Sequence, residues 1–112
     1  MKLIKKGEGE PYEAEGHFGV WSMRKLFAGK DSQRLIIGLS HFLPQGGMKM
    51  APASPSERTY FILNGSMRVK GKSEEYLLGQ GDMLYIGPGE EREIQAQGSE
   101  PCTVLLSIAK LD

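Results

Sequence analysis

The sequence has little of what would mark a secreted, membrane-bound or nucleic-acid-binding protein. Its one cysteine, Cys102, cannot form a disulfide within the chain, so we expect a cytoplasmic protein. The 14 basic and 14 acidic residues cancel, and a neutral chain has no net attraction for nucleic acid or an anionic membrane surface. The longest apolar run, 103–109, is far too short to span a bilayer. We therefore expect no nucleic-acid partner and no membrane partner.

The composition is that of an ordinary globular domain. Of the 112 residues, 39% are hydrophobic and 25% are charged, proportions that argue against a disordered chain. No internal repeat and no linker-like segment interrupts the sequence. This pattern predicts a single domain over residues 1–112 with its core at about 18–110.

Glycine and proline divide the chain into short segments. The 15 Gly and six Pro residues favour short strands over long helices. The segments between them are rich in Val, Ile, Leu, Tyr and Phe, which are typical of strands. The sequence therefore predicts an all-β fold. The expected strands are Val20–Phe27, Arg34–Leu43, Arg58–Leu63, Ser66–Lys70, Met83–Ile86 and Cys102–Lys110, and Glu74–Leu78 and Glu93–Gln97 carry weaker signals.

Two connecting segments stand out between these strands. Asn64-Gly65 is typical of a tight hairpin turn, because both residues tolerate positive φ. It predicts that the strands on either side of it pair with each other. Residues 48–57 contain Pro52 and Pro55 and are expected to form an irregular loop over one end of the domain.

Alternation along two of the expected strands assigns candidate residues to faces. His41 shares a face with four aliphatic residues, and we expect this face to point inward: Leu35, Ile37, Leu39 and Leu43. Arg58 and Tyr60 share one face of the strand at 58–63. Apolar residues occur on both faces of that strand, as expected for a sheet with a lined cavity on one side and a partner on the other.

Two segments of the chain have a recognisable spacing of glycines and intervening residues. The first runs from Gly46 through Pro52, Ser54 and Arg58 to Gly65. It resembles the first motif of the cupin family, G-x5-H-x-H-x3/4-E-x6-G, in spacing from end to end.

The second segment opens at Gly81 and continues through Gly87-Pro88-Gly89 to Arg92 and Ala96. It resembles the second cupin motif, G-x5-P-x-G-x2-H-x3-N. Together the two segments cover about half of the chain. The resemblance implies the family's fold, a double-stranded β-helix or jelly-roll barrel. Because small cupins usually pair, it also implies a homodimer, which the apolar faces of the central strands favour.

The sequence departs from the cupin motifs at the positions of the metal ligands. Metal-bearing cupins use three His and one Glu, and this chain has Pro52, Ser54, Arg58 and Arg92 at the matching positions. Proline has no side-chain donor, serine is a poor ligand, and two guanidinium groups repel a divalent cation. The resemblance therefore implies a barrel without the usual metal site, and we expect no metal cofactor.

Two arginines at the ligand positions leave a positive centre where relatives hold a cation. Guanidinium groups bind carboxylates, enolates and phosphates through paired hydrogen bonds. We therefore expect Arg58 and Arg92 to bind a small organic anion inside the barrel. The alternative is that the arginines only pair with carboxylates at the rim: Glu57, Glu90, Glu91 or Glu93.

Other residues are candidates for the same site. His41 is either a general acid or base facing the cavity or a structural histidine bonded to a neighbour. Tyr60 either moves a proton or packs with its hydroxyl satisfied. The remaining candidates for ligand contact are Ser54, His17, Trp21 and Met50; the alternative for His17 is an exposed loop residue, and for Trp21 and Met50 it is a core residue.

Three functions are compatible with these residues. The first is a metal-independent enzyme, an isomerase, lyase or decarboxylase, in which His41 or Tyr60 moves a proton on a small anionic substrate. The second is a non-catalytic ligand-binding or sensor module that uses the same pocket. The third is a metalloenzyme with unusual ligands, Glu57, His17 and His41, which would require a slip of one residue along a strand.

Overall fold

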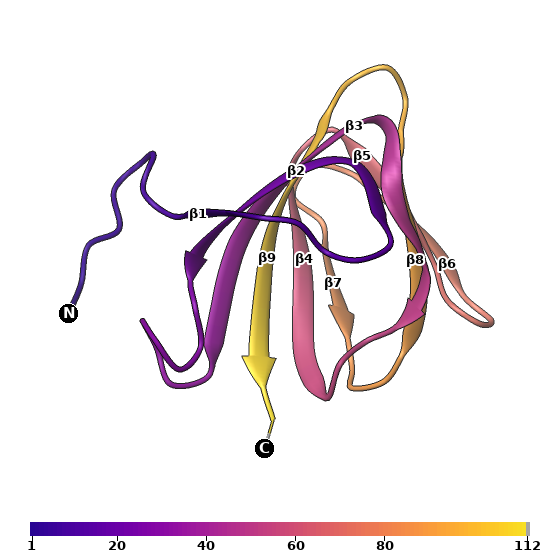
Figure 1. Ribbon diagram of the computed structural model, residues 1–112. Coiled ribbons are helices and arrows are strands. Elements are labelled where there is room, and N and C mark those ends of the chain that lie inside the picture. The colour runs from indigo at the N-terminus through magenta and orange to yellow at the C-terminus, as the bar shows by residue number, and fades with distance from the viewer. Residues whose placement is uncertain (112) are drawn as a thin grey trace.

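The protein is a β-barrel without helices in the described part of the chain. A computed structural model describes residues 1–111 (Figure 1). No helix in this range is long and apolar enough to cross a membrane. The nine strands are β1 (Glu10–Tyr12), β2 (His17–Leu26), β3 (Leu35–Pro52), β4 (Ser56–Asn64), β5 (Ser66–Lys70), β6 (Glu75–Leu78), β7 (Met83–Ile86), β8 (Glu91–Gln97) and β9 (Cys102–Lys110).

All named strand pairs are antiparallel, and the long strand β3 belongs to both sides of the barrel. The strand order is β6-β5-β8-β3-β9-β4-β7, with β2 paired to β3 and β1 paired to β2. The first half of β3, residues 35–42, pairs with β9. Its second half, from 47 to 52, pairs with β8. Because β3 turns the corner between the two halves, two curved walls face each other across a common interior (Figure 1).

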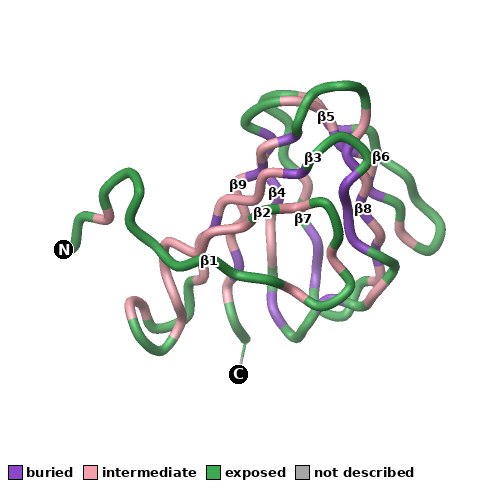
Figure 2. Tube along the Cα trace, turned by 45° about the horizontal axis from the view of Figure 1, so that its top comes forward, coloured by how far each residue is buried: buried purple, intermediate pink, exposed green. Residues whose placement is uncertain are grey.

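The core lies between these two walls. Buried residues recur at every second position along β5 and β8 and lie at Cys102, Val104 and Ile108 of β9 (Figure 2). This spacing follows from the alternation of side chains along a strand. Ile62, Met67, Ala96 and Cys102 are fully buried. The expected all-β barrel is therefore confirmed.

Most of the strands expected from the sequence are present. The bounds of β5, β7 and β9 are those that were predicted, and β2, β4, β6 and β8 differ by a few residues at their ends. The expectation of an irregular loop over 48–57 is wrong. Strand β3 continues to Pro52 and β4 starts at Ser56, so only three residues separate them. Proline is tolerated at a strand end, where its missing N–H breaks no interior pairing.

The predicted hairpin at Asn64-Gly65 is also wrong. A turn does join β4 to β5 there, but β4 pairs with β7 and β9, whereas β5 pairs with β6 and β8. The turn therefore carries the chain from one wall of the barrel to the other. Gly65 has φ 79°, and a Cβ at this position would lie 2.4 Å from the carbonyl oxygen of Pro101. Glycine is needed here by a close backbone approach rather than by a hairpin.

Candidate functional site

A cavity of about 80 Å³, open on one side, lies between the two walls. Six strands of the barrel and the chain around β1 supply its lining. Its lining combines apolar side chains with three arginines, one histidine, one serine and two tyrosines. The lining residues are Tyr12, Ala14, His17, Arg24, Ser40, Phe42, Arg58, Tyr60, Met67, Arg92, Ile94, Val104, Leu106 and Ile108.

Arg92 is the most deeply buried of the cationic residues. Its side chain is held on β8 with only 6% of the residue exposed. Nε donates a hydrogen bond to Tyr60 Oη at 3.2 Å, and Nη1 donates to the carbonyl oxygen of Ala51 at 3.1 Å. Both partners are neutral, so neither offsets the charge of the guanidinium group.

Arg58 reaches the same cavity from β4. Nη2 donates to the hydroxyl oxygens of Ser54 at 2.9 Å and Ser56 at 3.1 Å. Its Nε is buried and has no acceptor among the described residues. Burial lowers the pKa of Arg58; the nearby Tyr60 opposes this shift and the positive charge of Arg92 adds to it. Ser54 therefore orients Arg58 rather than lining the cavity itself.

Arg24 is a third cationic residue in the cavity, and the sequence interpretation missed it. Its guanidinium carbon lies 3.6 Å from the centre of the Tyr12 ring, a cation–π contact. The buried Nε of Arg24, like that of Arg58, has no acceptor in residues 1–111. Alternation along β2 places Arg24 on one face with Val20 and Ser22, but it does not say which face is inward.

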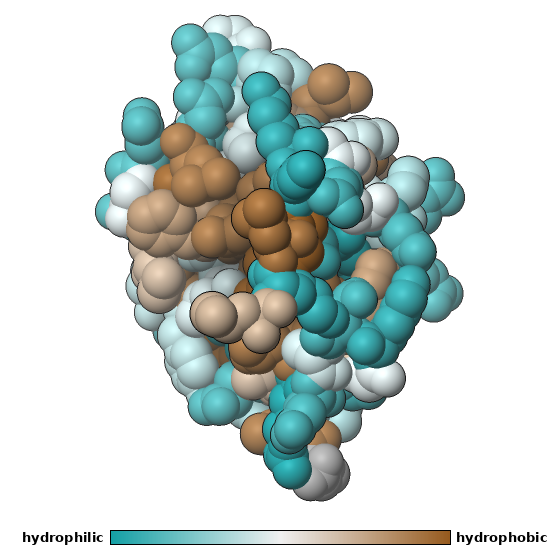
Figure 3. All heavy atoms as spheres, turned by 90° about the vertical axis from the view of Figure 1, so that its left-hand side faces the viewer, coloured by the Kyte–Doolittle hydropathy of each residue, from teal (hydrophilic) through white to brown (hydrophobic). Residues whose placement is uncertain are grey.

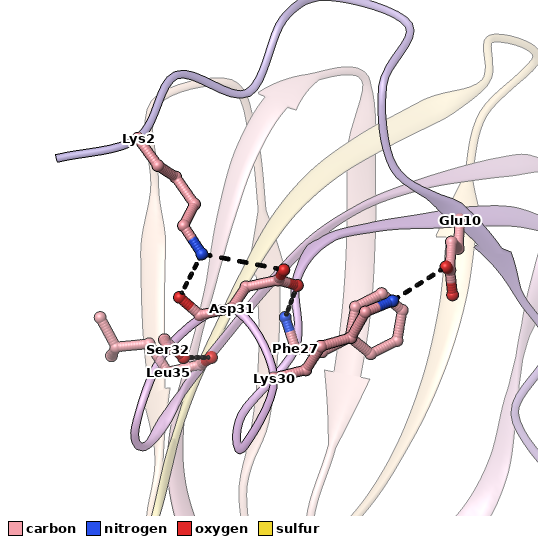
Figure 4. Close-up of polar contacts among 7 residues, drawn as sticks. All are labelled: Lys2, Glu10, Phe27, Lys30, Asp31, Ser32 and Leu35. Atoms are coloured by element: carbon pink, nitrogen blue, oxygen red, sulfur yellow. Dashed lines mark hydrogen bonds and ion pairs between the residues drawn. The ribbon is translucent and has the colours of Figure 1, made fainter.

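The segment that carries Tyr12 is tied to the loop between β2 and β3 (Figure 4). Lys2 Nζ donates to the carbonyl oxygen of Asp31 at 2.8 Å, and Lys30 Nζ lies 3.2 Å from a carboxylate oxygen of Glu10. Asp31 in turn accepts a hydrogen bond from the backbone N–H of Phe27 at 3.0 Å. These contacts hold the N-terminal segment across β2, where Tyr12 covers Arg24.

His17 lines the cavity although its position in the sequence gave little indication of it. The pairing register of β2 with β3 shifts between Phe18 and Val20. Such a bulge changes which side of a strand a residue faces, and this brings His17 to the same side as Arg24. Nδ1 of His17 lies 3.1 Å from the carbonyl oxygen of Glu15.

The surroundings of His17 favour its neutral form. Burial lowers its pKa below 6.5, the hydrogen bond to Glu15 opposes the shift, and the charges of Arg92 and Arg58 lower it further. A carbonyl oxygen can only accept a hydrogen bond, so Nδ1 carries the proton. In the neutral ring, Nε2 therefore has the free lone pair.

The cavity has no acidic counterpart to these cations. None of its lining residues is Asp or Glu. In residues 1–111, no carboxylate lies within ion-pair distance of Arg24, Arg58 or Arg92. Glu57 instead accepts from Tyr85 Oη at 2.8 Å, and Glu90 accepts from the backbone N–H of Gly87 at 2.6 Å. The alternative in which Arg58 and Arg92 pair with rim carboxylates is therefore wrong.

His41 and Trp21 lie on the outside of the barrel. The expectation that the His41 face of β3 points inward is wrong, because Ser40 and Phe42 line the cavity and Leu43 is 60% exposed. His41 stacks on Trp21 with ring centroids 5.4 Å apart, and its Nδ1 lies 3.1 Å from Thr103 Oγ1. In the first half of β3, the aliphatic residues therefore lie on the outer face, and Ser40 and Phe42 lie on the face that lines the cavity.

Met50 also lies away from the cavity lining and is 41% exposed on β3. Of the predicted site residues, the structure thus brings together Arg58, Arg92, Tyr60 and His17, with Ser54 beside Arg58. It separates them from His41, Trp21 and Met50. The roles of both groups of residues in binding or catalysis stay predictions.

The residues present do not fit a bound transition metal. The positions that match the metal ligands hold Pro52, Ser54, Arg58 and Arg92, and two of them are cations that share the cavity. In residues 1–111, no group of three or more His, Cys, Asp and Glu side chains is placed to hold a metal ion. The alternative set does not converge either, since His17 lines the cavity while His41 stacks on the outer Trp21 and Glu57 bonds to Tyr85.

Comparison with solved structures shows the same architecture. A predicted oxalate decarboxylase from Thermotoga maritima superimposes with a TM-score of 0.85 at 17% identity, covering 98% of this chain and all (100%) of the other. The polyketide cyclase RemF from Streptomyces resistomycificus gives a TM-score of 0.81 at 16% identity, covering 97% and 79%. At these identities the likeness concerns the fold alone.

Sequence comparison identifies the family. The family model described as "Cupin domain" matches residues 38–108. The beta-D-galactosidase Rv1717 of Mycobacterium tuberculosis is 30% identical over 112 residues, which cover 97% of this chain and 94% of that protein. Enzymes thus occur among the similar proteins. The chain belongs to the cupin family.

Proposed function

We propose that this cupin binds a small organic anion through the guanidinium groups of Arg58 and Arg92. The observation that supports the proposal is the charge of the cavity: Arg24, Arg58 and Arg92 line it, and no Asp or Glu does. An uncompensated buried charge destabilises a fold unless a counter-ion joins it. An anionic ligand supplies that counter-ion.

The geometry of the arginines suits a carboxylate. The neutral partners of Arg92 use Nε and one hydrogen of Nη1, so its other N–H groups have no hydrogen-bond partner among the described residues to compete with a ligand. The buried Nε of Arg58 also lacks an acceptor among the described residues. Carboxylate oxygens accept such hydrogen bonds in pairs.

The size of the cavity limits the ligand. One water needs at least about 10–15 Å³, so a cavity of about 80 Å³ suits a ligand of a few non-hydrogen atoms. Malonate and pyruvate are of this size, whereas a hexose is larger. The ligand class is therefore a short-chain carboxylate.

Titration calorimetry with malonate, at low ionic strength, tests this proposal. We expect binding to wild type and at least a tenfold loss of affinity in both Arg58→Gln and Arg92→Gln, because a hydrogen bond to a charged group contributes about 1.5–3 kcal/mol. Arg68→Gln is the matched control, since Arg68 already pairs with Glu75 at 3.3 Å. Equal affinity in wild type and in both cavity variants would contradict the proposal.

A second candidate function is hydrolysis of a galactoside. The name of the relative that is 30% identical supports it. Glycoside hydrolysis uses a pair of carboxylates, and the arginine-lined cavity contains none. A second cavity of about 70 Å³ does contain Glu74, Glu90 and Glu91, and it shares Arg92 with the first.

This candidate is tested by release of p-nitrophenol from p-nitrophenyl β-D-galactoside. If galactoside hydrolysis is the function, wild type releases p-nitrophenol and Glu74→Gln and Glu91→Gln reduce the rate strongly, while Arg58→Gln affects it little. Glu10→Gln is the control, because Glu10 pairs with Lys30 at 3.2 Å and does not line this cavity. No hydrolysis by wild type would remove the candidate.

A further inference from the structure

One residue of the arginine-lined cavity is suited to accept a proton at neutral pH. The titratable side chains that line it are Tyr12, Tyr60, His17 and the three arginines. Guanidinium groups have no lone pair to accept a proton, and a phenol is a donor at neutral pH. His41, the other histidine of the chain, lies outside against Trp21. Within residues 1–111, His17 is therefore the base available to a ligand in this cavity.

The contacts of His17 prepare it for this role. Its Nδ1 donates to the carbonyl oxygen of Glu15 at 3.1 Å, which fixes both the tautomer and the orientation of the ring. Nε2 has no hydrogen-bond partner among the described residues. In the register of β2 with β3, His17 pairs with Met48, whose side chain has no hydrogen-bond donor.

We propose that His17 is the general base of this cavity and removes a proton from the carbon next to the carbonyl of a bound 2-oxo acid. The C–H bond breaks, Nε2 takes the proton, and the electron pair of that bond forms an enolate. Return of the proton from Nε2 restores the neutral ring and the carbonyl compound. No oxidant, reductant or second substrate is needed. The inference rests on the proposed anion site, because that site holds the acid.

The arginines favour this step as well as binding. Formation of the enolate moves negative charge onto the carbonyl oxygen, and Arg58 and Arg92 lie in the same cavity as His17. Fixed positive charge stabilises such an oxyanion in a site that excludes water. The same charges, after burial, keep His17 unprotonated at neutral pH. One cluster thus holds the carboxylate, stabilises the enolate and keeps the base free.

The experiment measures exchange of carbon-bound hydrogen in pyruvate and 2-oxobutyrate for deuterium in D₂O by NMR, with spontaneous exchange subtracted. His17→Asn is the test variant, because the asparagine amide can still donate to the Glu15 carbonyl but lacks the basic Nε2. His41→Asn is the matched control on the outer face. Titration calorimetry with malonate and with both acids reports binding separately for each variant.

We expect wild type and His41→Asn to exchange the hydrogen, and His17→Asn to lose at least 100-fold in rate while binding the acids as before. The wild-type kcat/KM is expected to fall where His17 takes up a proton, below pH 6.5, and His17→Asn is expected to lack this inflection. Binding without exchange in wild type, or unchanged exchange in His17→Asn, overturns the inference and leaves the anion site intact. Absence of binding in wild type overturns both.

Discussion

Buried arginines usually have carboxylate partners, and those of this barrel have neutral ones instead. Arg92 donates to a phenol and a carbonyl, and Arg58 donates to two serine hydroxyls. Hydroxyl and carbonyl partners satisfy N–H groups without cancelling charge. They orient the side chains and leave the positive charge available. At the scale of the residue, the positive charge of the site therefore depends on the neutral hydrogen-bond partners of Arg58 and Arg92 as well as on the arginines themselves.

The hydroxyl of Tyr60 is expected to matter for stability because it accepts from Arg92 Nε. Tyr60→Phe leaves that N–H in a residue with 6% exposure and no replacement acceptor. We predict a loss of about 1–3 kcal/mol in the free energy of unfolding, measured by urea denaturation.

Tyr85→Phe is the control for this prediction. Tyr85 is 56% exposed and its hydroxyl donates to Glu57 at the surface, so the change is expected to cost less than about 0.5 kcal/mol. Equal losses in the two variants would show that the Tyr60–Arg92 contact contributes no more than a surface hydrogen bond.

At the scale of the element, turns and bulges decide what the strands present to the cavity. A shift of register in β2 brings His17 to the same side as Arg24. The turn at Gly65 moves the chain from one wall to the other, so that β5 pairs with β8 and contributes Met67 to the cavity. Such features change which side chains face the cavity and which strands pair, without changing which residues are in strands.

Gly65 is expected to tolerate substitution poorly. In Gly65→Ala the new Cβ would lie 2.4 Å from a backbone oxygen of Pro101, and the residue would keep φ 79°. Gly89→Ala is a matched control, because Gly89 has φ 75° but open space around its Cβ position. We predict about 1–2 kcal/mol of destabilisation for Gly89→Ala from the backbone alone and clearly more for Gly65→Ala.

Thermal and urea unfolding of both variants provide the measurement. A difference between them isolates the steric effect of Pro101, since the left-handed backbone conformation is common to both positions. If the two variants lose the same stability, the neighbouring chain can move aside and the close approach at Gly65 does not constrain the fold.

At the scale of the whole molecule, the outer face of one wall is unusually apolar. Figure 3, seen from the left-hand side of Figure 1, shows apolar side chains gathered in the middle of the face with polar ones around them. Large side chains on the outer face of β2, β3, β4 and β7 are 39–61% exposed: Trp21, Leu35, Leu43, Leu63, Met83 and Tyr85.

We predict that this face binds a second copy of the chain. Six half-exposed large side chains present on the order of 600 Å², which approaches the roughly 800 Å² per partner of a standard interface. Light scattering after size exclusion is expected to give a dimer at micromolar concentration. Leu43→Lys combined with Met83→Lys is expected to give a monomer.

Leu77→Lys is the control for the dimer, because Leu77 is 71% exposed on β6, which lies on the other wall. This variant is expected to remain dimeric. A monomeric wild type would overturn the prediction, and so would a dimer that survives both lysines.

Much of the fold and part of the site were accessible from the sequence. The predicted strands at 66–70, 83–86 and 102–110 have the bounds of β5, β7 and β9, and the resemblance to cupins is confirmed by the family model over residues 38–108. Alternation along 58–63 correctly grouped Arg58 with Tyr60. Local patterns sufficed here because spacing along a strand and turn-forming residues act over a few residues.

What the sequence by itself determined was therefore the class of fold and most strand positions, and the resemblance to cupins placed Arg58 and Arg92 at two of the four positions that match metal ligands. Only the tertiary structure decided which side of β3 faces the cavity, that β4 and β5 do not pair, and that Arg24 and His17 join Arg58 and Arg92. The apolar pattern of β3 could not reveal its inward side, because Leu43 is exposed on the outer face while Phe42 is buried on the inner one. Facing and partner choice depend on contacts between residues far apart in the chain, and no local pattern contains them.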